Sequence, residues 1–506
     1  MQGFRGLTLQ QSSALTTMRH RFQIQPELQL TPIEKIRLPL HSRDELPPIL
    51  AGLQWVWMHP TLQSEILALI EAVVLADKKA TGRPGLHLWQ ILVLGVVRLG
   101  LDADWDRMEH IANYDALVRQ MLEVPAAPWG GASKTFGHQT RRDNVARLDE
   151  ALLQQINVRI AAAGRAVFVK KGGGPLAPLA LKVDPSVLET DVPFPTDLNL
   201  LWDAGRKCVD WVEGLRASGY ALPGWRKCKD WRRQLKNLQR STSPIVYRGG
   251  PNKAARVKPA VREYLGVGRV LSAKVRLSLL ELCDLAVDPA RWDRLAYFQL
   301  MLDKHLDLVQ RRLLNEETIP APEKMVSLFE PHTEWIQKDK QRPTVELGHR
   351  LLLATDQNQL IQDYAVLLQE AEVDQSIAVV DRLLGRHGAT GLASVSFDKG
   401  FSCMGDREVL ELYVPVVVMP KRGKKNAAET ERESGKQFVA LRHQHSAVES
   451  EINSLEHHGL NRCLDVGLPG YLRYVGLGVL SYNLHVIGRE LLARQRAESA
   501  SVCLTA

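Results

Sequence analysis

The segment Leu179-Ala180-Leu181-Lys182-Val183-Asp184 is a short apolar run that ends in an acidic residue. A second segment of this kind, Ala393-Ser394-Val395-Ser396-Phe397-Asp398, occurs later in the chain, and a third acidic residue, Glu449, lies on a stretch with helical spacing. Both short runs favour buried strands. Two carboxylates at strand ends and one on a helix can converge on divalent cations, because Mg²⁺ takes oxygen ligands. Two such ions about 4 Å apart stabilise both the attacking and the leaving oxygen of a phosphoryl transfer.

Other aspartates near these strands compete for the same role. Asp191 and Asp197 follow the first strand beside prolines, where aspartate is common in turns and caps. Asp406 follows the second strand but lies in a more polar, helical stretch. We therefore assign Asp184 and Asp398 to the site.

The helical stretch offers two glutamates. Ile452 and Leu455 mark its buried face, and Glu449 lies at the edge of that face, whereas Glu451 lies roughly on the far side. We therefore assign Glu449. His445, one turn before it, is expected to contact a DNA phosphate or to support the carboxylates from behind.

Composition bounds the class of protein. The 506 residues suggest about three domains. The six cysteines lack CxxC spacing, which argues against a zinc ribbon or a disulfide framework and suits a reducing cytoplasm. The histidines near Glu449 have no cysteine in range, so they are weak grounds for zinc: His443, His445, His457 and His458.

Three further classes are disfavoured: secreted proteins, membrane-spanning proteins and nucleotide hydrolases. The basic start of the chain has no apolar centre, so we expect no signal peptide. The apolar stretch 86–101 contains His87, Gln90 and Arg98 and is too short to span a membrane, so it is expected to be a buried helix. Gly172-Gly173-Gly174 does not continue into a Walker A motif, which disfavours nucleotide hydrolysis.

Changes of pattern along the chain predict its domains. The expected ranges are 1–45 for an N-terminal arm, 46–170 for a helical DNA-binding domain, 178–204 and 340–490 for the catalytic domain, 205–339 for a basic and helical insertion, and 491–506 for a tail. Strands, a hairpin and helices alternate in the catalytic ranges, which is typical of an α/β fold. The hairpin strands are expected at 345–354 and 360–368, a further strand at 414–419, and a helix capped by Asp374.

Three short helices are expected at 86–100, 104–111 and 114–122. They suit a helix-turn-helix unit, and a helical bundle without DNA contact is an equal alternative.

Positive charge is concentrated in the insertion. Residues 206–276 contain 18 Lys and Arg against four acidic residues, a larger excess than the +8 of the whole chain. Trp211, Trp225, Trp231 and Tyr247 are interleaved with them, which suits phosphate contacts and base stacking, and the alternative is a solvated charged face. The residues expected to bind DNA are Arg206, Lys207, Arg226, Lys227, Lys229, Arg232, Arg233, Lys236, Arg240, Arg248 and Lys253, with Lys399 beside the second strand.

Taken in order, these motifs resemble a known family. The block 183–197 that contains Asp184 resembles the first-aspartate block of DDE transposases from bacterial insertion sequences. Phe397-Asp398-Lys399-Gly400-Phe401 resembles their second-aspartate block, and Val448-Glu449-Ser450-Glu451-Ile452 resembles their glutamate helix. Further resemblance at Gly82-Arg83-Pro84 and at 458–463 extends the similarity over most of residues 75–490.

The resemblance implies a ribonuclease H-like mixed-sheet core with a large, mainly helical insertion, preceded by an all-helical domain. It implies Asp184, Asp398 and Glu449 as catalytic residues and ligands of Mg²⁺, for which Mn²⁺ substitutes. It also implies cleavage and strand transfer of a DNA element with terminal inverted repeats. The relatives' Tyr, Arg and Lys around the glutamate correspond to Arg442, His445 and Glu456, so their hairpin mechanism is not carried over.

The partners follow from that activity. We expect double-stranded DNA, as element ends and target, in the bacterial cytoplasm at the nucleoid and without a membrane. A homodimer on DNA would hold two ends together. The stripe 295–313 and the helix around 475–492 are candidate dimer contacts, with intramolecular core as the alternative. Two other functions stay open: a non-catalytic DNA-binding protein of transposase origin, and a metal-dependent nuclease without strand transfer.

Overall fold

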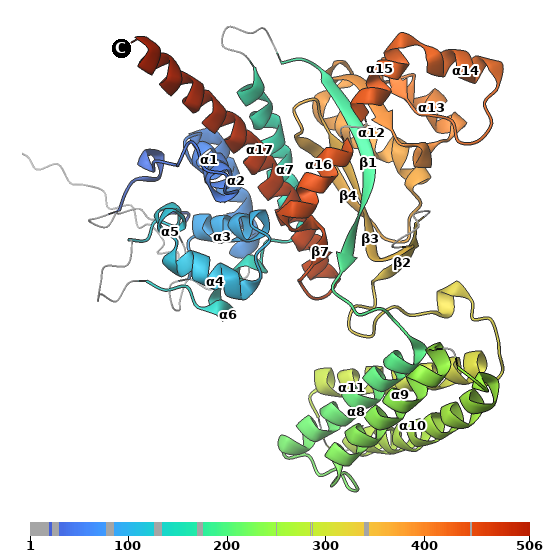
Figure 1. Ribbon diagram of the computed structural model, residues 1–506. Helices are drawn as coiled ribbons and strands as arrows, with labels where there is room; N and C mark the ends of the chain where they lie inside the picture. Colours follow the sequence, from blue (N-terminus) through green and yellow to red (C-terminus); the bar gives the residue numbers. More distant parts are fainter. Residues whose placement is uncertain are drawn as a thin grey trace, which may run out of the picture. The chain divides into compact units, whose positions relative to one another are not determined.

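The chain folds into two units, each with its own hydrophobic core. Unit 1 comprises Met1–Asp191 with Gly348–Ala506, and unit 2 comprises Val192–Leu347. The computed structural model in Figure 1 describes residues 20–22, 30–76, 85–125, 134–169, 176–248, 250–283, 285, 287–338, 344–445 and 448–505, without the side chains of 448–451 and 502–505.

A mixed sheet lies at the centre of the region that the sequence predicts to be catalytic. Its strands are β1 (Leu179–Thr190), β2 (Glu334–Gln337), β3 (Val345–Thr355), β4 (Ile361–Leu367), β5 (Leu392–Phe397), β6 (Val417–Val418) and β7 (Arg462–Cys463). Within the described ranges the order is β2-β3-β1-β5-β6, with β4 also paired to β3 and β7 to β1. β3 is antiparallel to β1 and β4, whereas β5 is parallel to β1 and β6 is parallel to β5. The α/β class is therefore confirmed.

The central strand β1 is longer than the run 179–183 that predicted it. It continues through Pro185, although proline disfavours central strands because it has no backbone donor. β5 pairs with β1 only as far as Val183, and β7 pairs with it only from Glu189. Between them one edge of β1 is open among the described strands, and this opening accommodates the proline.

Some helices of unit 1 pack against this sheet, and the others pack against those helices (Figure 1). Their bounds are α1 (Leu46–Trp57), α2 (Pro60–Val74), α3 (Leu88–Gly100), α4 (Trp105–Tyr114), α5 (Ala116–Met121), α6 (His138–Val145), α7 (Glu150–Gly164), α12 (Gln375–His387), α13 (Met404–Leu410), α14 (Ala427–Ser434), α15 (Lys436–His445), α16 (Val448–Leu455) and α17 (Leu468–Thr505). The long α17 packs against α1, α3 and α7. Every residue of α3 is buried, so this helix cannot itself enter a DNA groove.

The crossing of α1 and α17 depends on two glycines. A Cβ atom on Gly488 would lie 1.8 Å from the carbonyl oxygen of Pro48, and one on Gly52 would lie 2.2 Å from that of Leu484. Only glycine allows backbones to approach so closely. The N-terminal helices and the end of the chain therefore share one core.

Unit 2 is built around four helices, α8 (Asp197–Ala217), α9 (Cys228–Tyr247), α10 (Lys253–Cys283) and α11 (Pro289–Leu313). α8 packs against α9 and α11, and α10 packs against α9 and α11. The stripe 295–313 belongs to α11 and lies largely in this core. It is therefore intramolecular core, and most of 475–492 is likewise buried in unit 1.

The structure confirms some of the other predicted elements and boundaries and differs from others. The three helices after residue 85, the hairpin and the strand 392–397 are confirmed. The strand expected at 414–419 comprises only Val417–Val418, and Asp374 makes no capping hydrogen bond to α12. Unit 2 begins at Val192 rather than 205, and the helices expected as a separate domain share a unit with the sheet. The Gly82-Arg83-Pro84 block lies outside the described residues, among which no helix has the length and apolarity to cross a membrane.

Candidate active site on the mixed sheet

The two aspartates lie at neighbouring positions on adjacent strands. Val183 of β1 is opposite Phe397 of the parallel strand β5, and Asp184 and Asp398 directly follow these two residues. Side chains alternate along a strand, so Lys182 lies on the same face as Asp184. The side chain of Asp184 is 17% exposed, and Asp398 is exposed. The sheet therefore places the two predicted aspartates at neighbouring backbone positions at the point where β5 ends.

Core packing holds the turn that carries Asp398. This residue precedes the 3-10 turn η6 (Lys399–Phe401), and its carbonyl oxygen accepts a hydrogen bond from the backbone N–H of Phe401 at 3.2 Å. Phe401 is fully buried, and its ring centroid lies 5.3 Å from that of Phe397. The backbone of Asp398 is thus fixed from both sides.

His445, at the end of α15, lies over the same face. Its Nδ1 is 2.9 Å from the hydroxyl of Ser396, and its Nε2 is 4.0 Å from a carboxylate oxygen of Asp184. Burial lowers the pKa of His445, although the Asp398 carboxylate acts to raise it, and Lys182 lowers it further. The ring is therefore neutral at neutral pH and lies beside Asp184 without adding positive charge.

Glu449 lies on α16, and this helix contacts β1 directly. The side chains of Glu449 and Glu451 lie outside the described residues, so the structure places their helix and not their carboxylates. α16 leads into the π-helical turn η7 (Glu456–Leu460). The backbone thus brings the third predicted element to the strand that carries Asp184.

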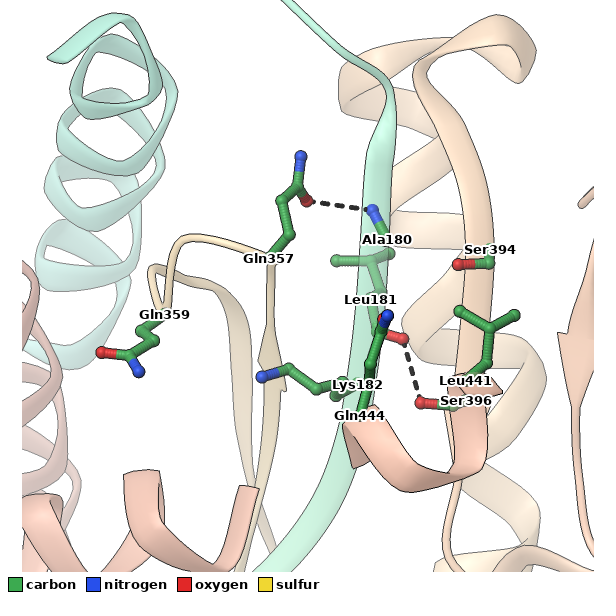
Figure 2. A pocket seen from close by; sticks show the side chains of 9 residues that line it. All are labelled: Ala180, Leu181, Lys182, Gln357, Gln359, Ser394, Ser396, Leu441 and Gln444. Atoms are coloured by element: carbon green, nitrogen blue, oxygen red, sulfur yellow. Dashed lines mark hydrogen bonds between the residues drawn. The ribbon is translucent and has the colours of Figure 1, made fainter. Parts of the chain in front are cut away.

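A hollow of about 340 Å³ lies beside β1 and β5, and its lining includes Lys182 and Ser396, each two residues before one of the aspartates (Figure 2). Its lining comes from β1, the β3–β4 turn, β5 and α15, namely Ala180, Leu181, Lys182, Gln357, Gln359, Ser394, Ser396, Leu441 and Gln444. Gln357 accepts a hydrogen bond from the backbone N–H of Ala180 at 3.0 Å, and the Ser396 hydroxyl donates to the carbonyl of Leu181 at 3.3 Å. Sequence reasoning missed Lys182 and Ser396. Strand alternation could have indicated them, because each lies two residues before an aspartate.

The competing aspartates have structural partners. Asp406 accepts a hydrogen bond from a serine hydroxyl of α12 at 2.6 Å. Asp191 lies 3.5 Å from Arg462 of β7, and Asp197 pairs with Arg312 at 2.7 Å. These contacts explain the three residues without catalysis.

Several of the predicted DNA-binding residues in unit 2 are engaged within the protein. Arg232 pairs with both Asp210 and Glu213 at 2.7 Å. Arg206 and Arg233 each pair with an aspartate three residues earlier, at 2.7 and 2.6 Å. Lys207 and Lys236 lie over aromatic rings. The remaining members are exposed: Arg226, Lys227, Lys229, Arg240, Arg248 and Lys253, with Lys399 in unit 1.

The interleaved aromatic residues differ in exposure. Trp225 is 1% exposed and donates a hydrogen bond to the Ser278 hydroxyl at 2.8 Å, so the expectation that it stacks on bases is wrong. Trp211 and Trp231 pack partly against the core, and Tyr247 is exposed. The tryptophans here mainly hold the bundle together.

A hollow of about 290 Å³ lies between the end of α9 and the start of α10. It is lined by Ser241, Pro244, Ile245, Arg248, Gly250, Lys253 and Arg256. No ion pair within the described residues engages Arg248, Lys253 or Arg256. These three cations are arranged to receive an anion such as a phosphate, and sequence reasoning missed Arg256.

The sheet site can coordinate a hard cation and support phosphoryl transfer, because its donors are carboxylate oxygens. Comparisons of the chain with models of protein families, with curated proteins and with solved structures find no match. The function must therefore be argued from the site itself.

Proposed function

We propose that this protein is a DDE-type DNA transposase that cleaves the ends of a mobile element and joins them to target DNA. The observation that carries the proposal is the parallel pairing of β1 with β5, which sets Asp184 beside Asp398. α16, the helix of Glu449, contacts the same strand. This is the arrangement that the family resemblance implies, with two carboxylates on strands and one on a helix.

The donor set fits Mg²⁺ or Mn²⁺. Asp184 and Asp398 offer carboxylate oxygens, and Glu449 would supply a third carboxylate from α16. When bound, the ions lower the pKa of water and neutralise charge that develops on the phosphoryl oxygens. His445 stays neutral, and its Nε2 lies 4.0 Å from a carboxylate oxygen of Asp184.

The chain's own residues position the DNA. The hollow beside β1 and β5 offers amide, hydroxyl and ammonium groups to a DNA strand, and Lys399 lies exposed next to Asp398. In cleavage, a water oxygen bonds to phosphorus and the bond to the 3′ oxygen of the element breaks, leaving a 3′-hydroxyl. In joining, that hydroxyl attacks a target phosphodiester in line, and a target 3′-hydroxyl leaves.

The finer fold and the assembly belong to the same proposal. A ribonuclease H-like core agrees with a sheet in which antiparallel strands lie on one side of β1 and parallel strands lie on the other. Unit 2 would bind element DNA through its exposed cations, with one protein chain acting on each of two ends. The protein would then act in the bacterial cytoplasm at the nucleoid.

A supercoiled donor plasmid carrying the inverted repeats that flank this gene tests the proposal. It is incubated with the protein, Mg²⁺ and a target plasmid, and the joined products are sequenced. Insertion products that require Asp184 and Asp398 support a transposase. Cleavage without joining would replace it with the nuclease alternative, and binding alone would replace it with the non-catalytic one.

A further inference from the structure

A second group of chelating side chains lies in unit 1, on elements other than the strands that carry the two aspartates. Glu45 precedes α1, His458 belongs to η7, and His485 lies on α17. One ligand atom from each lies within 4.8 Å of the other two. Nε2 of His485 is 2.7 Å from Oε2 of Glu45, and Nε2 of His458 is 4.0 Å from the same oxygen.

The hydrogen bonding of His458 fixes its tautomer. Its Nδ1 lies 2.9 Å from the carbonyl oxygen of Gly100, and a carbonyl only accepts, so the proton is on Nδ1. Nε2 therefore presents a lone pair toward the Glu45 carboxylate. Two acceptors face each other there, and a cation between them would satisfy both. A histidine that binds a metal through one nitrogen commonly donates its other N–H to a backbone carbonyl.

The spacing and burial suit a tetrahedral ion. Ligand atoms 2.0–2.1 Å from Zn²⁺ lie roughly 3.3 Å apart in a tetrahedron. The two distances of 2.7 and 4.0 Å bracket that value, so small side-chain rotations would complete the geometry. The side chains of His458 and His485 are 3% and 8% exposed, whereas that of Glu45 is 56% exposed and leaves an open side for a water ligand.

We propose that Glu45, His458 and His485 bind one transition-metal ion of the Zn²⁺ class, at a site separate from the two aspartates and independent of the proposed function. Two imidazoles and one carboxylate favour Zn²⁺ or Co²⁺ over Mg²⁺, which prefers oxygen ligands alone. On binding, the proton of His485 moves from Nε2 to Nδ1, so the ring stays neutral. Burial lowers the pKa of His458, which keeps its nitrogen available to the metal at neutral pH.

The ion would join three distant segments. It would tie the start of α1 to α17 and to η7, which directly follows α16. The metal is structural in this role, because it braces the turn after the helix that carries Glu449. Of the four histidines weighed for zinc in the sequence, only His458 takes part, and its partners lie far from it in the chain.

Co²⁺ titration of the full chain tests the site. Tetrahedral Co²⁺ with nitrogen ligands absorbs visible light strongly, and an excess of Mg²⁺ keeps the carboxylate site occupied. We expect one equivalent of Co²⁺ to bind, to raise the melting temperature, and to be displaced by Zn²⁺. Glu45→Gln and His485→Gln should each weaken binding by at least about 100-fold, since even indirect supports of a metal contribute 10–100-fold. His41→Gln, which removes an exposed histidine four residues before Glu45, should bind like the wild type.

The Asp184→Asn variant separates this site from the proposed catalytic one. It should keep the Co²⁺ spectrum, because it alters the other site. The inference is overturned if the wild type shows no tetrahedral spectrum. It is equally overturned if Glu45→Gln and His485→Gln bind as tightly as His41→Gln, or if the spectrum is lost with Asp184→Asn alone. Glu45→Gln changes a half-exposed side chain, so loss of folding does not obscure the result.

Discussion

The two units differ in what determines the positions of their charged side chains. In unit 1, strand register sets Asp184 beside Asp398, and the apolar face of the same strands locks that register, because a slip of one residue would bury the carboxylates. In unit 2, cations cover a helical bundle, and many are held in ion pairs of exposed side chains. The activity of a site fixed by strand register should depend on each single carboxylate. DNA binding by a charged surface should depend on the total number of its cations.

The largest effect is expected on strand cleavage, when either aspartate of the sheet site is replaced. Asp184→Asn and Asp398→Asn keep the side-chain shape but remove a charged ligand. Each should reduce strand cleavage by about 1,000-fold, at the upper end of losses seen when one group that stabilises developing charge is removed. DNA binding and the melting temperature should remain close to those of the wild type. Cleavage of labelled element ends by purified variants measures this.

Matched variants control that experiment. Asp381→Asn alters an exposed aspartate of α12 and should cleave normally. Glu449→Gln should behave like Asp184→Asn, with Glu451→Gln active. Activity of Glu449→Gln together with inactivity of Glu451→Gln would reverse the assignment on α16.

The second largest effect is expected on the stability of the two hydrophobic cores. Gly488→Leu forces a side chain against the carbonyl of Pro48 at the α1–α17 crossing and should destabilise unit 1 by about 3 kcal/mol. Gly214→Ala on α8 meets open space and should stabilise unit 2 by about 0.5–1 kcal/mol, since glycine is costly inside a helix. Hydrogen exchange of peptides from each unit reads the two separately. Equal loss of protection in both units after Gly488→Leu would show that they unfold together.

Unit 2 contains a buried acid-sensitive group. His305 is 1% exposed, and neither of its ring nitrogens has a hydrogen-bond partner among the described residues. Burial and, to a lesser extent, the charge of Lys304 lower its pKa to about 4. The unfolded chain takes up a proton near pH 6.5, so stability falls as the pH drops from about 6.5 toward 4.

The loss between pH 7 and pH 5 should be about 2 kcal/mol. His305→Leu removes the titrating group and should flatten this part of the pH profile of unit 2. Denaturant unfolding followed at both pH values for the two proteins measures it. Identical pH dependence of wild type and variant would mean that His305 is solvated.

The smallest effect is expected on the charged surface. Replacing Arg248, Lys253 and Arg256 with glutamine should lower the slope of log K against log salt, by up to about 0.9 for each phosphate that the protein then leaves unneutralised. Replacing the paired Arg232 and Arg233 should change the slope less, because carboxylates already neutralise them. The affinity of each variant for an element end, measured at several salt concentrations, gives the two slopes to be compared. A larger change for the paired arginines would reverse this ranking.

The sequence predicted much of the sheet, because the pattern of apolar residues that indicates a strand extends over only a few residues. The apolar runs that end at Asp184 and Asp398 predicted the two strands, although they did not indicate Lys182 and Ser396 on the same face. The sequence did not predict that β1 continues through Pro185, since this depends on an edge left open by β5 and β7. It also could not distinguish cations that are paired from those that are open.

Long-range contacts explain the other misses. Charge counting treated Arg232 and Arg248 alike, yet only Arg232 meets two carboxylates from another helix. Trp225 looked available for stacking and is instead a core residue. Glu45 and His485 have no local pattern at all, because their proximity arises from the crossing of α1 with α17.

That crossing has a consequence for how the protein is made. The hydroxyl of Ser481 donates to the carbonyl of Val96, across 385 residues of chain. At ribosomal rates of 5–20 residues per second, about 20–80 s pass between the synthesis of α3 and the synthesis of the part of α17 that binds it. Unit 2 is one continuous stretch and can fold on the ribosome meanwhile. The apolar N-terminal helices must be kept from aggregating until α17 emerges, so we expect the nascent chain to depend on chaperones that bind exposed apolar segments.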